Sequence, residues 1–312
     1  MAEEKVIRIG MIGLDTSHAT NFTAILNDPK NERGHVPGGR VVAGVKQFSP
    51  DIESSASKVE AYVELLTTKY GVKIYDSVEA MLPHVDAVMV ESVDGRPHLA
   101  QAKPAIEAGK LVFVDKPMAA SLKDVIEIFD LAKKHNTQVW SASNLRYHKG
   151  TVAAQNAKVG DIVSVFSYGP APTEEHHPDL MWYGIHPVEA MFTVMGSGCR
   201  TVRRTYTEGT DLVTGVWDDG KLGVMMGIRE GRRGYGVKVF GTKGIEEFST
   251  GGAYPELLTE VIKFFRTGKP PIEPGTTIEI FAFMEAADES KRQNGKPISI
   301  KEMIAKKVQA LK

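Results

Sequence analysis

Residues 5–28, KVIRIGMIGLDTSHATNFTAILND, join an apolar strand, a short turn and a helix-like segment. The hydrophobic pattern predicts the strand over 5–12 and the helix over 17–28, with Ser17 as the expected cap. A strand–turn–helix unit of this kind presents backbone N–H groups and a helix N-terminus to one point in space. Such a point favours the pyrophosphate of a dinucleotide.

The turn itself departs from the usual glycine pattern. Gly10 and Gly13 are present, whereas Asp15 and His18 stand where the later glycines are expected. An acidic side chain that faced a phosphate would repel it, unless Asp15 turns away to cap the helix. Two interpretations stay open: a phosphate turn in which His18 donates to phosphate or substrate, or a turn in which Asp15 and Ser17 are only caps.

The first part of the chain alternates strand-like and helix-like segments. Further strands are predicted at 40–45, 72–75, 86–92, 110–117 and 137–143, and helices at about 55–70, from 77, at 97–109 and at 121–136. Near-continuous apolar strands between helices indicate a parallel sheet that is covered on both faces. We therefore predict an α/β, Rossmann-like dinucleotide-binding domain over residues 1–145.

The pattern changes after about residue 146. Strands are predicted at 161–169, 201–208, 211–219, 221–230, 235–242 and 244–249, and helices at about 147–159, 185–196, 254–267, 276–293 and 301–312. The alternating segments indicate an open, mainly antiparallel sheet with one face free to pack on another surface. Residues 146–312 are predicted to form an α+β domain for substrate binding and oligomerisation.

Composition excludes several classes of protein. The chain has 312 residues, of which 42% are hydrophobic and 25% charged, and its net charge is −1. The interspersed charges predict neither a nucleic-acid surface nor a membrane surface. No apolar segment approaches the roughly 20 residues that span a bilayer. With a charged N-terminus and Cys199 as the single cysteine, we expect a cytoplasmic protein without disulfides.

In a parallel sheet, ligands bind at the carboxyl ends of the strands. Four segments reach that edge here, namely 13–18, 46–49, 92–98 and 115–117. An acidic residue after the second strand would bind the ribose of NAD, but Lys46 stands there. Together with Ser49, a lysine there favours the 2′-phosphate of NADP by charge attraction. The alternative is a solvated lysine.

Lys116 follows an apolar strand in VFVDKPMAAS (112–121), and Pro117 restricts the chain directly after it. A lysine in a dry cleft beside a cationic nicotinamide would exchange a proton with a substrate hydroxyl while a hydride moves. The simpler interpretation is an ion pair between Lys116 and Asp115.

Several motifs together resemble those of the Gfo/Idh/MocA oxidoreductases. VFVDKP (112–117) is similar to the family's Glu-Lys-Pro signature, with aspartate in place of glutamate. PHLAQAKPAIEAGK (97–110) resembles the segment in which a histidine, here His98, opens the helix before that strand. GIHPVEAMFTVMG (184–196) resembles the helix with the catalytic histidine, here His186. FGTKGIEEF (240–248) and MEAADESKRQNGKPI (284–298) resemble the closing segments, so the similarity covers nearly the whole chain.

The resemblance implies an NAD(P)-dependent oxidoreductase that acts on a sugar, polyol or related hydroxy compound, and a homo-oligomer that forms through the second sheet. The catalytic residues would be Lys116, His186 and Tyr183. The cofactor-binding residues would be Gly10, Gly13, Asp15, Thr16, Ser17, His18, Lys46, Ser92, His98, Asp115, Lys116, Pro117 and Arg146. The substrate-binding residues would be His177, Trp182 and Asn144.

Departures from the family pattern keep other functions open. Trp182 stands where many relatives have an aspartate, and Glu189 replaces a second one. A lyase, hydratase or glycosidase-like enzyme with a tightly bound or absent cofactor is one alternative, and a non-catalytic binding protein is another. His176, His177, His186 and Glu189 have the residue types of a zinc site. Adjacent loop histidines point in different directions, however, so no metal is predicted.

Overall fold

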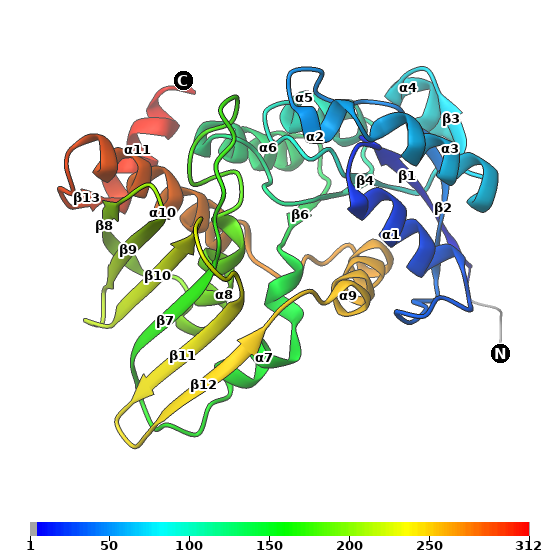
Figure 1. Cartoon of the computed structure of the whole chain (residues 1–312). Coiled ribbons are helices and arrows are strands. Elements are labelled where there is room, and N and C mark those ends of the chain that lie inside the picture. The colour runs from blue at the N-terminus through cyan, green and yellow to red at the C-terminus, as the bar shows by residue number, and fades with distance from the viewer. Residues whose placement is uncertain (1–4, 312) are drawn as a thin grey trace. The chain divides into compact units, whose positions relative to one another are not determined.

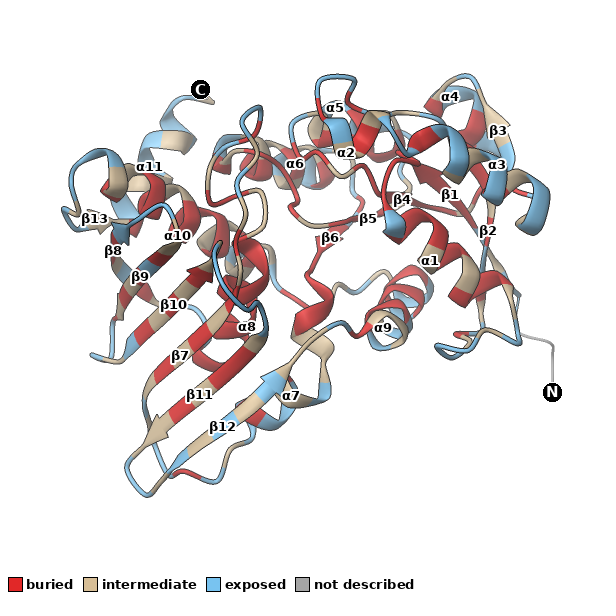
Figure 2. Ribbon diagram, viewed as in Figure 1, coloured by how far each residue is buried: buried red, intermediate tan, exposed pale blue. Residues whose placement is uncertain are grey.

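The computed structural model describes residues 5–311, and within them the chain forms two sheets. The first has six parallel strands in the order β3-β2-β1-β4-β5-β6 (Figure 1). Its strands are β1 (Ile7–Ile12), β2 (Gly39–Val45), β3 (Lys73–Tyr75), β4 (Ala87–Val90), β5 (Leu111–Val114) and β6 (Val139–Ser141). Every residue of β4 is buried, as Figure 2 shows, because helices cover both faces of such a sheet. The predicted Rossmann-like sheet is confirmed.

The connecting segments are helical, as the sequence predicts. They are α1 (Ser17–Asn27), α2 (Glu53–Ala56), α3 (Val59–Tyr70), α4 (Val78–Met81), the 3₁₀ turn η1 (Leu82–His84), α5 (His98–Glu107) and α6 (Leu122–Lys134). The helical segment predicted over about 55–70 is present but is divided into α2 and α3, with a break at residues 57 and 58. The expected cap of α1 is also wrong. Thr16 caps this helix and accepts hydrogen bonds from the N–H groups of His18 and Ala19.

The second sheet has seven strands within the described residues, in the order β12-β11-β7-β10-β9-β8-β13. They are β7 (Ile162–Pro170), β8 (Cys199–Tyr206), β9 (Thr210–Trp217), β10 (Leu222–Ile228), β11 (Tyr235–Gly241), β12 (Ile245–Thr250) and β13 (Ile298–Ser299). The pairs are antiparallel except for β7 with β10, so the mainly antiparallel prediction is confirmed. The two-residue β13 is too short to be seen in the hydrophobic pattern.

The later helices are η2 (Asn144–Tyr147), α7 (Lys149–Gln155), α8 (Ile185–Met195), α9 (Tyr254–Thr267), α10 (Pro274–Arg292) and α11 (Ile300–Gln309). Every residue of α8 is buried, and this helix packs against β7 and β10 (Figure 1). The predicted tail helix over 301–312 is present as α11, although residue 312 lies outside the described residues. None of the described helices is long and apolar enough to cross a membrane.

The contacts divide the chain into two compact units. The Rossmann unit contains the chain up to Ala119 together with Glu127–Ala142 and Tyr254–Ile272. The second unit contains Ala120–Ile126, Ser143–Ala253 and Glu273–Lys312. Where the sequence predicts one boundary near residue 145, the late helix α9 therefore belongs to the Rossmann unit. Its Ile262 packs against Gly39 at the start of β2, where a Cβ would approach to 2.3 Å.

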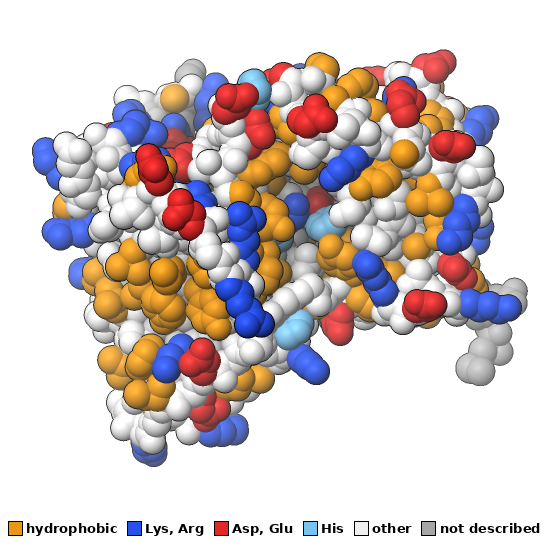
Figure 3. All heavy atoms as spheres, in the orientation of Figure 1, with side chains coloured by type: hydrophobic (Ala, Val, Ile, Leu, Met, Phe, Trp, Pro, Cys, Tyr) orange, Lys and Arg blue, Asp and Glu red, His pale blue; other side chains and the backbone are white. Residues whose placement is uncertain are grey.

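Alternation along the second sheet leaves one of its faces less buried. On β9 and β10 every second residue is buried, and the residues between them are partly or fully exposed (Figure 2). Those residues include Leu212, Val216, Leu222, Val224 and Met226. Figure 3 shows hydrophobic side chains gathered over these strands. The sheet thus has an apolar open face, as the alternating sequence predicts.

The side chain of Arg204 links several elements of the second unit. Its side chain is fully buried on β8 and donates to Asp211 of β9 at 2.8 Å, to Asp179 at 3.0 Å and to Asp288 of α10. Lys291 donates to the other oxygen of Asp179 at 2.7 Å. The loop before α8 is thereby fixed to the sheet and to α10.

We expect Arg204→Ala to lower the free energy of unfolding by about 3–5 kcal/mol, because it leaves buried carboxylates without their cation. Arg203→Ala, at the neighbouring exposed position of the same strand, is the matched control and should change it by less than about 0.5 kcal/mol. Denaturant unfolding followed by the fluorescence of Trp217 in the same unit measures both values. Equal losses in the two variants would contradict this role of Arg204.

Candidate functional site

Gly13 directly follows β1 and begins the turn into α1. Its φ of +80° is one that side-chain-bearing residues rarely adopt. A Cβ at this position would also lie 2.0 Å from the Oγ of Ser92 and 2.5 Å from its backbone nitrogen. Glycine is therefore required for two reasons, the backbone angle and the close approach of Ser92, the second residue after β4. Gly10 lies inside β1 instead, where a Cβ would meet the side chain of Met81. Glycine at position 10 therefore serves the packing of the core.

Asp15 faces inward. It is 1% exposed, and its carboxylate accepts hydrogen bonds from Ser55 Oγ at 2.5 Å and from the Val93 N–H at 3.1 Å. Burial raises the pKa of Asp15, and these hydrogen bonds offset only part of that effect. Ser17 is exposed on the first turn of α1. The idea that Asp15 and Ser17 cap the helix is wrong, because Thr16 supplies the capping oxygen.

His18, Asp115 and Lys116 come together at the carboxyl edge of the Rossmann sheet. His18 Nδ1 donates to Asp115 Oδ2 at 2.6 Å, and Lys116 Nζ lies 3.9 Å from the same oxygen. Although burial alone would raise the pKa of Asp115, the charges of His18 and Lys116 lower it to about 2. The expected pairing of Lys116 with Asp115 is present, and His18 shares it. His18 also stacks on Phe22, with ring centroids 4.7 Å apart.

Glu91 is a site residue that sequence reasoning missed. It directly follows β4 and is fully buried, and within residues 5–311 neither of its carboxylate oxygens has a hydrogen-bond partner. Ligand atoms of Glu91, Asp115 and His18 all lie within 4.8 Å of one another. Burial and the charge of Asp115 raise the pKa of Glu91 well above its usual value, and Lys116 offsets only part. The sequence does contain one indication of this site residue, because Glu91 is an acidic residue at the end of an otherwise apolar strand.

Ser92 and His98 organise the loop after β4. His98 is fully buried, and its Nε2 donates to the Ser92 carbonyl at 2.9 Å. Burial lowers the pKa of His98, and the Ser92 and Met118 carbonyls beside its two ring nitrogens offset part of that effect. Ser92 Oγ accepts a hydrogen bond from Gln101 Nε2 at 2.8 Å. Pro117 follows Lys116 through a cis peptide bond. His98 therefore positions the loop, and its nitrogens are turned toward backbone carbonyls rather than toward a ligand.

A pocket of about 430 Å³ opens beside the end of β2. It is lined by Lys46, Gln47, Phe48, Pro97, Ala100 and Gln101. The Oε1 atom of Gln101 is buried and has no partner among the described residues. Lys46 is exposed and forms an ion pair with Glu60 of α3. Ser49 bonds to Asp94 at 2.5 Å, inside a network that also holds Arg96.

In the second unit, His186 and Glu189 of α8 hold the segment around η2. Ser143 Oγ lies 2.7 Å from His186 Nδ1, and the Ser143 N–H donates to Glu189 at 2.6 Å. Arg146 Nε donates to the other oxygen of Glu189 at 2.7 Å. The predicted cofactor residue Arg146 thus has a carboxylate partner inside its own unit. Asn144 Oδ1 accepts from the Ala253 N–H at 3.2 Å.

Aromatic side chains surround His186. The ring of Tyr183 meets it edge-on, with centroids 4.8 Å apart, and Tyr235 lies on another side at 6.1 Å. His177 and Trp182 pair separately, with centroids 5.1 Å apart. The structure therefore groups the predicted residues Tyr183 and His186 closely, and places His177 with Trp182 in the loop before α8.

The histidines of the second unit do not form a metal site in the described part of the chain. His176 Nδ1 bonds to Glu174 at 2.8 Å, and Glu189 is bonded to Ser143 and Arg146. The three groups whose ligand atoms come close together are instead His18, Glu91 and Asp115.

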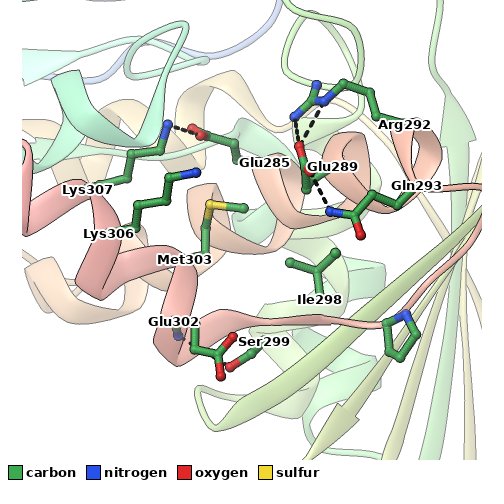
Figure 4. Close-up of a pocket in the computed structure, with 11 residues that line it drawn as sticks. Glu285, Glu289, Arg292, Gln293, Ile298, Ser299, Glu302, Met303, Lys306 and Lys307 are labelled. Carbon is green, nitrogen blue, oxygen red and sulfur yellow. Dashed lines mark hydrogen bonds and ion pairs between the residues drawn. The ribbon is translucent and has the colours of Figure 1, made fainter.

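Other hollows of the second unit carry no comparable chemistry. A pocket of about 470 Å³ between α10 and α11 has most of its charges paired, Lys307 with Glu285 and Arg292 with Glu289 (Figure 4). A further pocket borders Cys199, where burial raises the pKa of the thiol to about 12. That thiol stays protonated and is not a nucleophile.

The parallel sheet, the Gly13 turn and the lysine at the strand edge define a Rossmann-fold protein of the dinucleotide-binding class. Residues 7–143 match the family model GFO_IDH_MocA, described as an oxidoreductase family with an NAD-binding Rossmann fold. Over these residues the chain is similar to this family of oxidoreductases, which confirms the resemblance drawn from its motifs.

Three relatives illustrate the similarity. The uncharacterized oxidoreductase YrbE of Bacillus subtilis is 27% identical over 62% of this chain and 63% of its own length. A D-xylose 1-dehydrogenase (NADP(+)) of Haloferax volcanii is 28% identical over 53% of each chain. The structure of scyllo-inositol dehydrogenase from Lactobacillus casei with NAD(H) and scyllo-inositol superposes with a TM-score of 0.75 at 16% identity, over 95% of this chain and 99% of that one. The chain thus spans less than two thirds of the length of these curated relatives, while its whole fold matches the solved structure.

We expect Gly13→Ala to cost about 1–3 kcal/mol more unfolding free energy than Gly71→Ala, because only the first adds a clash with Ser92. Gly71 is the matched control, since it has a φ of +68° and no atom within 4 Å of an added Cβ. Both variants share the strain of a positive φ. Denaturant unfolding measures the difference, and equal costs would show that Ser92 does not require glycine at position 13.

Proposed function

We propose that the protein is an NAD(P)-dependent oxidoreductase that acts on a sugar, polyol or related hydroxy compound. The observation that carries the proposal is the placement of Lys116, 12% exposed in its side chain, at the carboxyl edge of a Rossmann sheet beside Asp115. A lysine side chain that is so nearly buried, within the segment that matches an oxidoreductase family model, is a candidate for proton transfer.

The Rossmann unit fits a dinucleotide at several points. The Gly13 turn lets the backbone approach a ligand closely, and the pocket beside Lys46 offers Phe48 as an apolar wall. Gln101, another residue of that pocket, is fixed by its Nε2 hydrogen bond to Ser92 Oγ at 2.8 Å. The inward orientation of Asp15 removes the repulsion that its charge would create. A bound nicotinamide supplies the hydride acceptor or donor.

Lys116 is proposed to move the proton. When a substrate hydroxyl is oxidised, its carbon loses a hydride and its oxygen loses a proton, and the neutral amine of Lys116 accepts that proton. In the reverse direction the ammonium returns it. Asp115 holds the side chain near this position through its charge, and His18 keeps the Asp115 carboxylate in place.

For the second unit we propose substrate binding and orientation. His186, with Ser143 on its Nδ1 and Tyr183 against its ring, has a fixed orientation suited to a hydroxyl-rich ligand. His177, Trp182 and Asn144 remain proposed substrate residues. A sugar or polyol is supported by the D-xylose and inositol dehydrogenases among the similar proteins. Division of labour between a cofactor domain at 1–145 and a substrate domain at 146–312 belongs to the same proposal.

A homo-oligomer is also proposed. The apolar open face of the second sheet, with Leu212 and Leu222 each 41% exposed, is the kind of surface that a second copy covers. Location in the cytoplasm and the absence of nucleic-acid or membrane partners remain predictions from composition.

The proposed activity is tested first by thermal shift with NAD, NADP and their reduced forms, since a ligand of the folded state raises the midpoint by mass action. Turnover of aldoses and polyols is then followed through the absorbance of the reduced nicotinamide. Lys116→Met should lower kcat by about 10²–10⁴-fold while dinucleotide binding persists. Lys123→Met, an exposed lysine on α6, is the control. No shift with any dinucleotide at millimolar concentration would refute the proposal.

Preference for NADP is proposed on Lys46, whose ammonium is already paired with Glu60. A 2′-phosphate has to compete with that carboxylate, so Glu60→Gln should increase the affinity for NADP relative to NAD, by up to about tenfold. Lys46→Ala should decrease the same ratio, because the cation that attracts the phosphate is lost. Titration of both dinucleotides by calorimetry measures the ratios. If neither variant alters the ratio, Lys46 does not select the cofactor.

A further inference from the structure

Three carboxylate oxygens at the Lys116 site lack a partner among the described residues. They are both oxygens of Glu91 and Oδ1 of Asp115, and all three are buried. The other oxygen of Asp115 accepts from His18 at 2.6 Å and faces Lys116 at 3.9 Å. Buried polar atoms are normally hydrogen-bonded, and each unpaired one is costly. Two ionised carboxylates cannot satisfy each other, because both only accept.

One proton resolves the problem. If Glu91 is protonated, its O–H is a donor, and Oδ1 of the neighbouring Asp115 is a buried acceptor without a partner among the described residues. Asp115 is then the one carboxylate of the buried group that carries a charge, and its Oδ2 atom is engaged by both His18 and Lys116. If Glu91 is ionised instead, two carboxylate charges lie close together in a site with almost no solvent contact, and no described residue bonds to the oxygens of Glu91. Like-charged carboxylates at short range do not both ionise.

A metal ion fits these groups less well than a proton. Atoms that bind one zinc ion lie about 2.0–2.2 Å from it, and hence roughly 3.3 Å or more from each other. His18 Nδ1 and Asp115 Oδ2 are 2.6 Å apart, a hydrogen-bond distance. Lys116 already supplies positive charge on the other side of that oxygen.

We propose that Glu91 is a neutral acid in the folded protein, that it donates its O–H to Asp115 Oδ1, and that by staying uncharged it keeps Lys116 able to release its proton. Its effect on Lys116 rests on the proposed function. Glu91 is a positioning residue that acts on the lysine through charge. Its ionisation adds a second anion to the site and holds Lys116 as an ammonium ion. Glu91 keeps its proton throughout, and only the proton of Lys116 is exchanged with the substrate.

The remaining titratable neighbours do not replace Glu91 in this role. His18 from α1 is engaged by Asp115, and the ring nitrogens of His98 from α5 lie against the carbonyls of Ser92 and Met118. Asp94, in the loop after β4, is held by Ser49 and Arg96. Glu91 is thus the group facing Lys116 whose charge is still free to change.

The protonation state is tested through the pH dependence of stability. A carboxyl group with a raised pKa binds a proton in the folded state that the unfolded chain releases above about pH 4.5. Its contribution to stability is therefore lost as pH rises. The unfolding equilibrium constant of the wild type, divided by that of Glu91→Gln, should increase about tenfold per pH unit above pH 5 until Glu91 ionises. A ratio that does not change with pH would overturn the proposal.

Infrared spectroscopy supplies a second readout that does not need the Gln variant to fold. Wild-type protein labelled with ¹³C in the glutamate carboxyl should show an isotope-shifted band of a protonated carboxylic acid at neutral pH. The band should persist in Glu279→Gln, which removes another partly buried glutamate of raised pKa in the second unit. Absence of the band, or its loss in Glu279→Gln, would refute a neutral Glu91. So would Zn²⁺ or Mn²⁺ that raises the melting temperature of the wild type but not of Glu91→Gln.

The effect on Lys116 is tested by the pH–rate profile in the direction of oxidation, where the base must be neutral. If Glu91 is neutral in the wild type, Glu91→Gln leaves the charge of the site unchanged, so the acid limb of kcat should coincide with that of the wild type. Glu279→Gln should also leave the profile unchanged, and a limb of Glu91→Gln that moves to lower pH would show that Glu91 is ionised and overturn the role. The stability and infrared readouts need no turnover. They decide the protonation of Glu91 even if the oxidoreductase activity itself fails.

Discussion

The hydrogen bond from His18 to Asp115 is the constraint on which the Rossmann site depends. It joins the first turn of α1 to the residue after β5, two segments that are 97 positions apart in the chain. The Oδ2 atom of Asp115 accepts the hydrogen bond from His18 and also faces Lys116. The Oδ1 atom is therefore left for Glu91. The histidine that replaces a glycine of the usual turn therefore has a structural partner. A buried pair of this kind leaves little freedom for the lysine beside it.

Much of the fold is predictable because it depends on local patterns. The apolar strands of the first sheet and the amphipathic α9 are visible in the sequence, and α9 begins and ends where the pattern indicates. The cap of α1 was less accessible, since Asp15, Thr16 and Ser17 are all good capping residues. Only the burial of Asp15 against Ser55 decides among them, and that contact joins residues 40 positions apart.

The candidate site was predictable in part for the same reason. Lys116 and His186 lie in motifs of adjacent residues, whereas the importance of Glu91 arises only when β4 and β5 pair side by side. The partners of Arg146 and Lys46, Glu189 and Glu60, are likewise brought in by other elements. The burial of Arg204 could not be predicted from the sequence, because residues 203–206, RRTY, have the pattern of a strand end with exposed charged side chains. Its burial follows from three carboxylates that come from a loop, a neighbouring strand and α10.

The capping oxygen of Thr16 has a consequence for how a dinucleotide would be held. Two N–H groups at the start of α1, those of His18 and Ala19, are already bonded to it. Fewer helix donors are then left for a pyrophosphate, and the neighbouring carboxylates add no attraction for one. In the proposed complex, affinity for a dinucleotide would then come mainly from its two ends rather than from its pyrophosphate. Binding of that kind would discriminate poorly against mononucleotide fragments that keep one end intact.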